Sequence, residues 1–195
     1  MLCLFLTVCG TVSFPFLYES QTLWYKFGLE KQMLRGAKIA GLISAILFLA
    51  QLLVAIRIRL FIEVYGVAKL MQFHRINGVI LLFFAFTHVT FVLIPEGLSN
   101  LPTGWDSWPE YIGFCLLILL ITNVLAATYR TSLTVSYKTW KAIHKFIGYA
   151  MFSLLPIHAL NVSETFDFTL PRILFYTFFS LTLVATINIS LTRKK

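Results

Sequence analysis

The chain has 195 residues, of which 58% are hydrophobic and 12% are charged. Soluble domains contain roughly 45–50% apolar and about 25% charged residues, so this composition excludes both an ordinary soluble domain and a disordered chain. The formal net charge of +8 would suggest a nucleic-acid partner for a soluble protein, but here the basic residues lie between long apolar runs. We therefore expect an integral membrane protein that is surrounded by membrane lipid and binds no nucleic acid.

Six apolar stretches are candidates to cross a bilayer, which takes about 20 helical residues each. The first is short and contains Gly10 and Pro15, but it lacks the basic leading region and the cleavage site of a signal peptide, so we expect a retained helix. In chain order, the predicted spans are 2–18, 37–56, 72–94, 111–129, 140–160 and 170–191. The short alternating strands of a membrane barrel are not seen in the sequence, and the length leaves no room for a second domain. The predicted fold is an all-α membrane protein, a six-transmembrane-helix bundle.

Two connections between the spans have a distinct composition. Residues 57–73 mix bulky apolar side chains with isolated charges, which predicts an amphipathic segment along the inner membrane surface. Residues 95–109 are rich in Gly, Pro, Ser and Asn, which predicts an irregular external connection.

The basic residues are divided unequally between the two faces of the predicted bundle. Eleven lie in the connections after the second and fourth spans and in the tail, whereas the opposite face has five basic and seven of the eight acidic residues. The positive-inside rule places the face with eleven cations, and with it both termini, in the cytoplasm. A basic cluster at 26–38 on the opposite face argues against this orientation. The eleven are Arg57, Arg59, Lys69, Arg75, Arg130, Lys138, Lys141, Lys145, Arg193, Lys194 and Lys195, and the five are Lys26, Lys31, Arg35, Lys38 and Arg172.

The three cysteines, Cys3, Cys9 and Cys115, all lie inside apolar runs. None of them belongs to a Cys-x-x-Cys motif. We expect buried thiols and neither a disulfide framework nor a zinc site.

All four histidines of the chain, His74, His88, His144 and His158, fall inside predicted spans. An ionisable side chain in the hydrocarbon region indicates a functional site. Two lie in the third span and two in the fifth, and each pair is separated by 14 positions, which in a helix is a rise of about 21 Å with nearly the same facing direction. The third and fifth spans run in the same direction, so His74 is expected level with His144, and His88 level with His158.

Two imidazoles at one level suit haem iron, which needs only two axial ligands. Zinc would require further ligands, and no cysteine or carboxylate is expected at either level. The pattern therefore predicts two b-type haems stacked across the membrane, and without a Cys-x-x-Cys-His motif no covalent attachment is expected. The alternative is that the histidines are hydrogen-bonded core residues.

The sequence around the two histidine pairs is repeated. A basic residue, Arg75 or Lys145, follows the first histidine of each pair, and a glycine, Gly78 or Gly148, lies four positions after that histidine. The glycine could leave room for a porphyrin edge, and the cation could offset a haem propionate. Ordinary helix packing and a membrane-boundary anchor are the alternative interpretations.

The four-histidine arrangement, with the segments 140–149 (WKAIHKFIGY) and 157–160 (IHAL), resembles the ferric-reductase-like transmembrane domain. That superfamily includes ferric and cupric reductases, NADPH oxidases and the haem-binding membrane subunit of the bacterial methionine-sulfoxide reductase system. The resemblance covers essentially the whole chain, 1–195, as one domain. It implies six helices, two b haems whose iron is bound by the four histidines, and outward electron transfer from a cytoplasmic donor.

Larger members of that superfamily carry a flavin and nicotinamide domain after the sixth helix, whereas this chain stops at Lys195. It also shows no Gly-rich phosphate-binding turn after a strand. We therefore expect a separate flavin reductase or a membrane quinol as electron donor. In this respect the chain is similar to the methionine-sulfoxide system subunit, which implies a bacterial inner membrane.

The sequence is compatible with three functions. The first is a dihaem oxidoreductase component that passes electrons to a metal ion, dioxygen or an external partner enzyme at the outer face. The second is a quinol-oxidising cytochrome b subunit of a respiratory complex, although no quinone pocket can be identified from the sequence. The third is a transporter whose histidines handle protons or metal ions, which the lack of Asp or Glu deep in the predicted spans disfavours.

Overall fold

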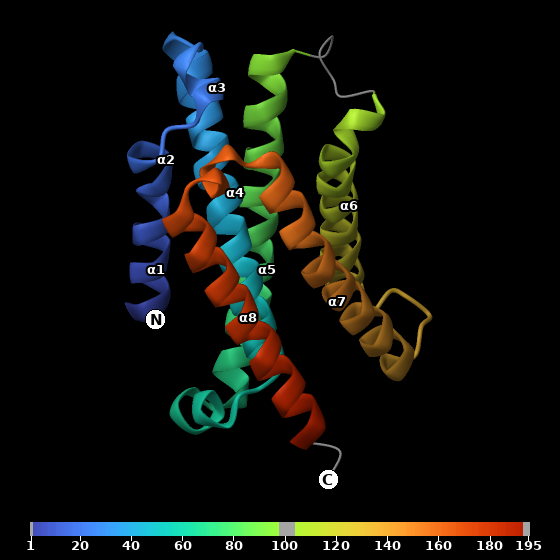
Figure 1. Cartoon of the computed structure of the whole chain (residues 1–195). Coiled ribbons are helices and arrows are strands. Elements are labelled where there is room, and N and C mark those ends of the chain that lie inside the picture. Colours follow the sequence, from blue (N-terminus) through green and yellow to red (C-terminus); the bar gives the residue numbers. More distant parts are fainter. Residues whose placement is uncertain (1, 98–103, 193–195) are drawn as a thin grey trace.

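A computed structural model of the chain describes residues 2–97 and 104–192, and its regular elements there are helices (Figure 1). In chain order they are α1 (Leu2–Val12), α2 (Phe14–Leu17), α3 (Gln21–Trp24), α4 (Gly28–Ala55), α5 (Arg59–Glu96), the 3-10 helix η2 (Trp105–Ser107), α6 (Trp108–Thr128), α7 (Tyr137–Val162), the 3-10 helix η3 (Glu164–Asp167) and α8 (Thr169–Thr192).

Five of the helices in the described residues, α4 to α8, are long and apolar enough to cross a bilayer. The first predicted span forms a shorter apolar segment over residues 6–17 instead. It is divided between α1 and α2, and Pro15 at the start of α2 has no amide hydrogen to continue the hydrogen-bond ladder. The chain is thus an integral membrane protein with an all-helical bundle, and five of the six predicted spans meet the length requirement.

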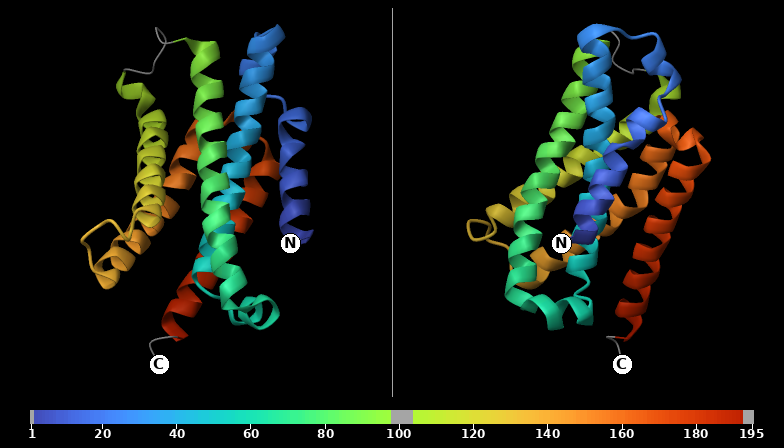
Figure 2. Two further views of the ribbon diagram at one scale, coloured as in Figure 1. Left: turned by 180° about the vertical axis from the view of Figure 1, so that it is seen from behind. Right: turned by 90° about the vertical axis from the view of Figure 1, so that its left-hand side faces the viewer.

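The helices pack around a core that runs through the middle of the bundle. α4 packs most extensively against α5, and α6 against α7, while α8 contacts α4 and crosses the bundle obliquely (Figures 1 and 2). The core cluster consists of Ile43, Leu47, Phe48, Leu49, Leu81, Leu120, Met151 and Phe152. Many other apolar side chains point outward, which in a membrane protein places them against lipid chains as apolar as themselves.

α5 is bent near its beginning. Gly66 has a φ of +73°, which a residue with a side chain rarely adopts. The preceding turns, braced by an ion pair of 2.8 Å between Arg59 and Glu63, lie at an angle to the long part of α5 (Figure 1). Their predicted position along the membrane surface stays a prediction. At the other end of α5 the helix continues to Glu96, so the predicted irregular connection begins later than expected, and its residues 98–103 lie outside the described residues.

The cysteine prediction is wrong where the structure describes the side chains. Cys9 and Cys115 are free thiols, as expected, but both are exposed on the surface of the bundle. Val8 and Leu116, in the same apolar runs, pack against the core of the bundle, whereas the two cysteines lie on other faces of their helices. An apolar neighbourhood in the sequence therefore did not indicate burial inside the protein. The side chain of Cys3 lies outside the described part.

The connections are arranged as the charge pattern predicts. The α4–α5 and α6–α7 connections and the end of α8 lie at one end of the bundle, with α3 and the end of α5 at the other (Figure 1). We call the first the basic end and the second the opposite end.

Candidate functional site

The two long helices α5 and α7 bring the four histidines together in two pairs. The ring centroids of His74 and His144 lie 6.1 Å apart, and those of His88 and His158 lie 6.4 Å apart. The planes of the rings are inclined to each other by 61° in the first pair and by 77° in the second. Each pair thus contains the partners that the helical spacing predicts. We call His74 and His144 the inner pair and His88 and His158 the outer pair.

The separation of the rings tests which metal centre each pair could hold. An imidazole centroid lies about 1.2 Å from its nitrogens and a histidine–metal bond is about 2.0 Å long, so two imidazoles on opposite sides of one iron have centroids about 6.4 Å apart. A tetrahedral ion would bring the centroids to about 5.2 Å. The observed distances fit the first arrangement. Among the described residues, no group of three or more His, Cys, Asp or Glu side chains is placed to hold a metal ion.

Both histidines of the outer pair have a hydrogen-bond partner on a neighbouring helix. His88 Nδ1 lies 2.9 Å from the carbonyl oxygen of Ala37 in α4, and His158 Nδ1 lies 2.9 Å from that of Pro109 in α6. A carbonyl can only accept, so in each ring the Nδ1–H donates. The lone pair of each neutral imidazole is then on Nε2, which is the arrangement that histidine ligands of metals usually show.

The inner pair has different surroundings. Within the described residues, Nδ1 of His74 and Nδ1 of His144 are buried and have no hydrogen-bond partner. The indole of Trp140 stacks on His144 with centroids 5.1 Å apart, and Tyr137 stacks on Trp140 at 5.8 Å. The guanidinium of Arg130 lies 4.7 Å from the centre of the Tyr137 ring. A row of aromatic rings therefore leads from the α6–α7 connection to the inner pair.

A polar brace, which was not predicted from the sequence, fixes α5 beside His74. Gln51 Nε2 in α4 donates to the His74 carbonyl at 2.8 Å, and Asn77 Nδ2 donates to the Gln51 side-chain oxygen at 2.7 Å and to the Leu47 carbonyl at 3.0 Å. Asn77 is only 3% exposed. The signal available in the sequence was the placing of two amide side chains inside apolar spans, where polar groups serve to join helices.

The four residues predicted to flank a porphyrin differ in their surroundings. Arg75 and Lys145 are exposed. Gly78 faces α4, where an added Cβ would lie 3.2 Å from Gln51 Nε2, so this glycine leaves room for the polar brace. An added Cβ on Gly148 would meet no atom within 4 Å, so this position is open. The role of these four residues beside a cofactor stays a prediction.

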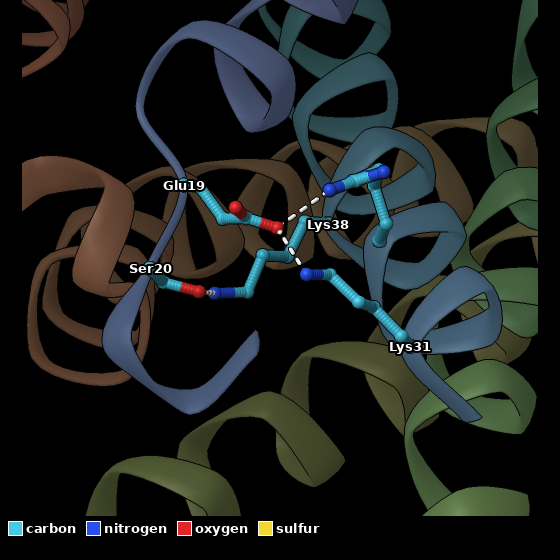
Figure 3. A network of polar contacts seen from close by, with 5 residues as sticks. Glu19, Ser20, Lys31 and Lys38 are labelled. Carbon is cyan, nitrogen blue, oxygen red and sulfur yellow. Dashed lines mark hydrogen bonds and ion pairs between the residues drawn. The ribbon is translucent and has the colours of Figure 1, made fainter. Parts of the chain in front are cut away.

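At the opposite end of the bundle, a network of charges holds the segment between α2 and α3 on α4 (Figure 3). The carboxylate of Glu19 pairs with Lys31 at 2.9 Å and with Arg35 at 2.6 Å. The ammonium of Lys38 donates to the hydroxyl of Ser20. The hydrogen bond from Lys31, together with its charge and that of Arg35, lowers the pKa of Glu19 below its ordinary value.

Glu164 extends this network to the connection between α7 and α8. Its carboxylate accepts hydrogen bonds from the hydroxyl and, at 3.2 Å, from the amide of Thr22, and it lies 3.9 Å from the Lys38 ammonium. Burial by itself would raise the pKa of Glu164, but these hydrogen bonds and the charge of Lys38 outweigh it and lower the pKa. α3, α4 and η3 are therefore joined through one carboxylate.

Two cavities lie among the helices that the structure describes. The smaller is lined by both outer histidines and by Lys38, and the rest of its lining is mostly apolar. The larger, of about 970 Å³, lies between α1, α4, α5 and α8. Its described lining is apolar except for a few groups that include Tyr65, Lys69 and Gln72, and it contains none of the histidines.

Comparison with known proteins identifies a family. Residues 40–160 match the family model described as ferric reductase like transmembrane component. The matched region contains both histidine pairs, the polar brace and the row of aromatic rings. No curated protein matches the chain.

Proposed function

Since the chain belongs to the ferric reductase like transmembrane component family, we propose that it is a dihaem electron-transfer protein of the membrane. It carries electrons from a donor at the basic end to an acceptor at the opposite end. The observation that supports this most directly is the ring separation of 6.1 Å in the inner pair and 6.4 Å in the outer pair, which suits two axial ligands of one iron at each level.

Each histidine pair would hold one b-type haem, and bound haem would supply one-electron redox chemistry that no side chain offers. The chain itself orients the ligands, excludes water and balances charge. Lys38, which lines the cavity of the outer histidines, is suited to offset propionate charge there, and Arg75 and Lys145 are suited to do so near the inner pair.

The space between the inner and the outer histidine pair is filled by a packed apolar core. Leu81 lies seven residues from both histidines of α5, and Met151 lies seven residues from both histidines of α7. Seven residues are nearly two full helical turns, so each of these side chains faces the same way as the histidines of its helix. Both are buried, at 4% and 5% exposure, which keeps water out of the space that electrons would have to cross.

The proposal includes an electron donor at the basic end and an electron acceptor at the opposite end. A flavoprotein at the basic end is the first candidate donor, because the row of Tyr137, Trp140 and His144 begins there. A chelated metal ion, dioxygen or an external partner enzyme is the acceptor at the opposite end. We further propose that α1 and α2 form a sixth, shorter membrane segment and that both termini are cytoplasmic, in a bacterial inner membrane.

A quinol is the second candidate donor, and the larger cavity favours it. A space of about 970 Å³ with apolar walls and a few polar groups is of the kind that binds a small amphipathic molecule. Reduction of the purified protein by a quinol analogue should be compared with reduction by a flavoprotein. If a quinol is the donor, Gln72→Leu should slow the first reaction and leave the second unchanged. Equal rates for this variant and the wild type with the quinol would exclude Gln72 from the site.

The main experiment is the visible spectrum of the purified protein with its haem content. We expect a reversible, dithionite-sensitive b-type spectrum with two haems per chain. His88→Ala and His158→Ala should each remove one haem, because the histidines that remain outside the outer pair both belong to the inner pair. A colourless wild-type protein, or unchanged haem content in both variants, would contradict the proposal.

A further inference from the structure

Two glycines leave the space in which the outer histidines lie. A Cβ added to Gly41 in α4 would lie 3.0 Å from His88 Nδ1 and 3.1 Å from its Cε1. A Cβ added to Gly113 in α6 would lie 2.9 Å from His158 Nδ1 and 3.0 Å from its Nε2, with a still shorter contact to Cε1. Real Cβ atoms essentially never approach as closely as one at Gly113 would, and the contacts of one at Gly41 would be tighter than nine in ten real contacts. Each imidazole therefore lies against the space that a side chain would fill.

Each glycine stands in the same relation to the carbonyl that its histidine contacts. Gly41 follows Ala37 by four residues, and Gly113 follows Pro109 by four residues. In a helix, a Cβ points back over the preceding turn, so the side chain at one position covers the carbonyl four residues earlier. A glycine there leaves the carbonyl open from the side, and in both helices an imidazole Nδ1 lies 2.9 Å from it.

The inner pair lacks this arrangement. Gly78 faces Gln51, and a Cβ added to Gly148 would meet no atom within 4 Å. Within the described residues Nδ1 of His74 and of His144 form no hydrogen bond, although the His74 ring also interacts with the backbone of Gln51. The two levels of the site are therefore chemically unlike, although their sequences are similar.

We propose that Gly41 and Gly113 are positioning residues that set the outer iron apart from the inner one. By admitting the imidazoles to the Ala37 and Pro109 carbonyls, they fix the Nδ1–H tautomer and the orientation of both rings. A histidine that donates its second N–H to a carbonyl is a more basic ligand and stabilises the more oxidised metal. The outer iron therefore has the lower midpoint potential of the two. This inference rests on the proposed function.

Alanine variants of the two glycines test the inference, because each adds only the Cβ considered above. Gly10→Ala in α1 is the matched control, since a Cβ at Gly10 would meet no atom within 4 Å. Each purified protein is assayed for haem content and titrated with reductant while the visible and electron paramagnetic resonance spectra are recorded. The outer haem is identified in the wild type as the component that His88→Ala removes.

Gly113→Ala and Gly41→Ala should disturb the outer haem to different extents. Gly113→Ala, with the shorter contacts, should reduce haem content from two to one per chain by removing the outer component. Gly41→Ala should retain two haems but raise the midpoint potential of the outer one. The inner component should be unchanged in both variants, which also shows that the bundle is folded, and Gly10→Ala should match the wild type.

Three results would overturn the inference. These are wild-type spectra and midpoints in both glycine variants, loss of the inner component along with the outer one, and an outer midpoint above the inner one in the wild type. A wild-type protein that binds no haem would instead refute the proposed function, on which the inference depends.

Discussion

At the scale of single residues, Glu164 joins three segments: it lies in η3, accepts hydrogen bonds from Thr22 in α3 and pairs with Lys38 in α4. Its pKa is lowered in the folded protein. A carboxylate with a lowered pKa stabilises the fold fully above its unfolded pKa, and this contribution is lost as the pH falls through the folded pKa.

We predict that Glu164→Gln lowers thermal stability at neutral pH but not in acid. The effect at pH 7 should be small, at most about 1 kcal/mol, because the side chain is partly exposed and solvent screens the pair. Thermal unfolding in detergent at several pH values measures it. The difference between the variant and the wild type should shrink as the pH falls below the ordinary value of 4.5. A constant difference down to pH 3 would show that the charge of Glu164 is unimportant.

The outer histidines show what single residues could and could not predict. Their pairing follows from a separation of 14 positions on two helices of the same direction, which is a property of each helix alone. Their second hydrogen bonds were not predictable, because Ala37 and His88 are 51 positions apart and Pro109 and His158 are 49 apart. Such contacts depend on how the helices are packed against each other.

At the scale of helices, the polar brace of Gln51 and Asn77 fixes how α4 and α5 lie against each other. Hydrogen bonds between membrane helices contribute about 0.6 kcal/mol each on average. The brace also includes the carbonyl of His74, so it links helix packing to the level of the inner pair.

We predict that Asn77→Ala lowers the free energy of unfolding by about 1–2 kcal/mol, because two hydrogen bonds are lost and the Gln51 oxygen is left without its donor. Asn123→Ala is the control, since Asn123 Oδ1 is buried without a partner and its removal should be neutral or stabilising. Thermal unfolding of both variants in the same detergent makes the comparison. Equal destabilisation would mean that the brace does not hold α4 to α5.

The limits of the helices were predictable only in part. The fourth predicted span, 111–129, is close to α6, because Pro109 near the start of α6 and the end of the apolar run mark both limits. The third, 72–94, is much shorter than α5, since helix formation continues through the charged residues before it and is interrupted only at Gly66. Hydropathy measures burial in lipid, whereas helix limits depend on backbone hydrogen bonds.

At the scale of the whole molecule, the proposed direction of electron transfer depends on which end faces the cytoplasm. The α6–α7 connection lies at the basic end, whereas η2 belongs to the connection between the far ends of α5 and α6 (Figure 2). Ser132 in the first and Asp106 in the second are both exposed. These two positions can report the orientation.

We predict that, with Cys3, Cys9 and Cys115 replaced by serine, Asp106→Cys reacts with a membrane-impermeant maleimide in intact cells. Ser132→Cys should react only after the membrane is permeabilised, because the positive-inside rule places the basic end in the cytoplasm. Labelling followed by gel electrophoresis reads out both variants. The reverse pattern would invert the proposed direction of electron flow.

The sequence alone determined that this is a helical membrane protein and which histidines meet, because hydropathy and the period of the α-helix are local properties of the chain. Only the tertiary structure decided that Gly78 makes room for Gln51 and that Gly41 and Gly113 admit the outer histidines. Each of these depends on the close approach of segments far apart in the chain. Because a glycine has no side chain, its part in packing can be recognised only when the groups beside it are known.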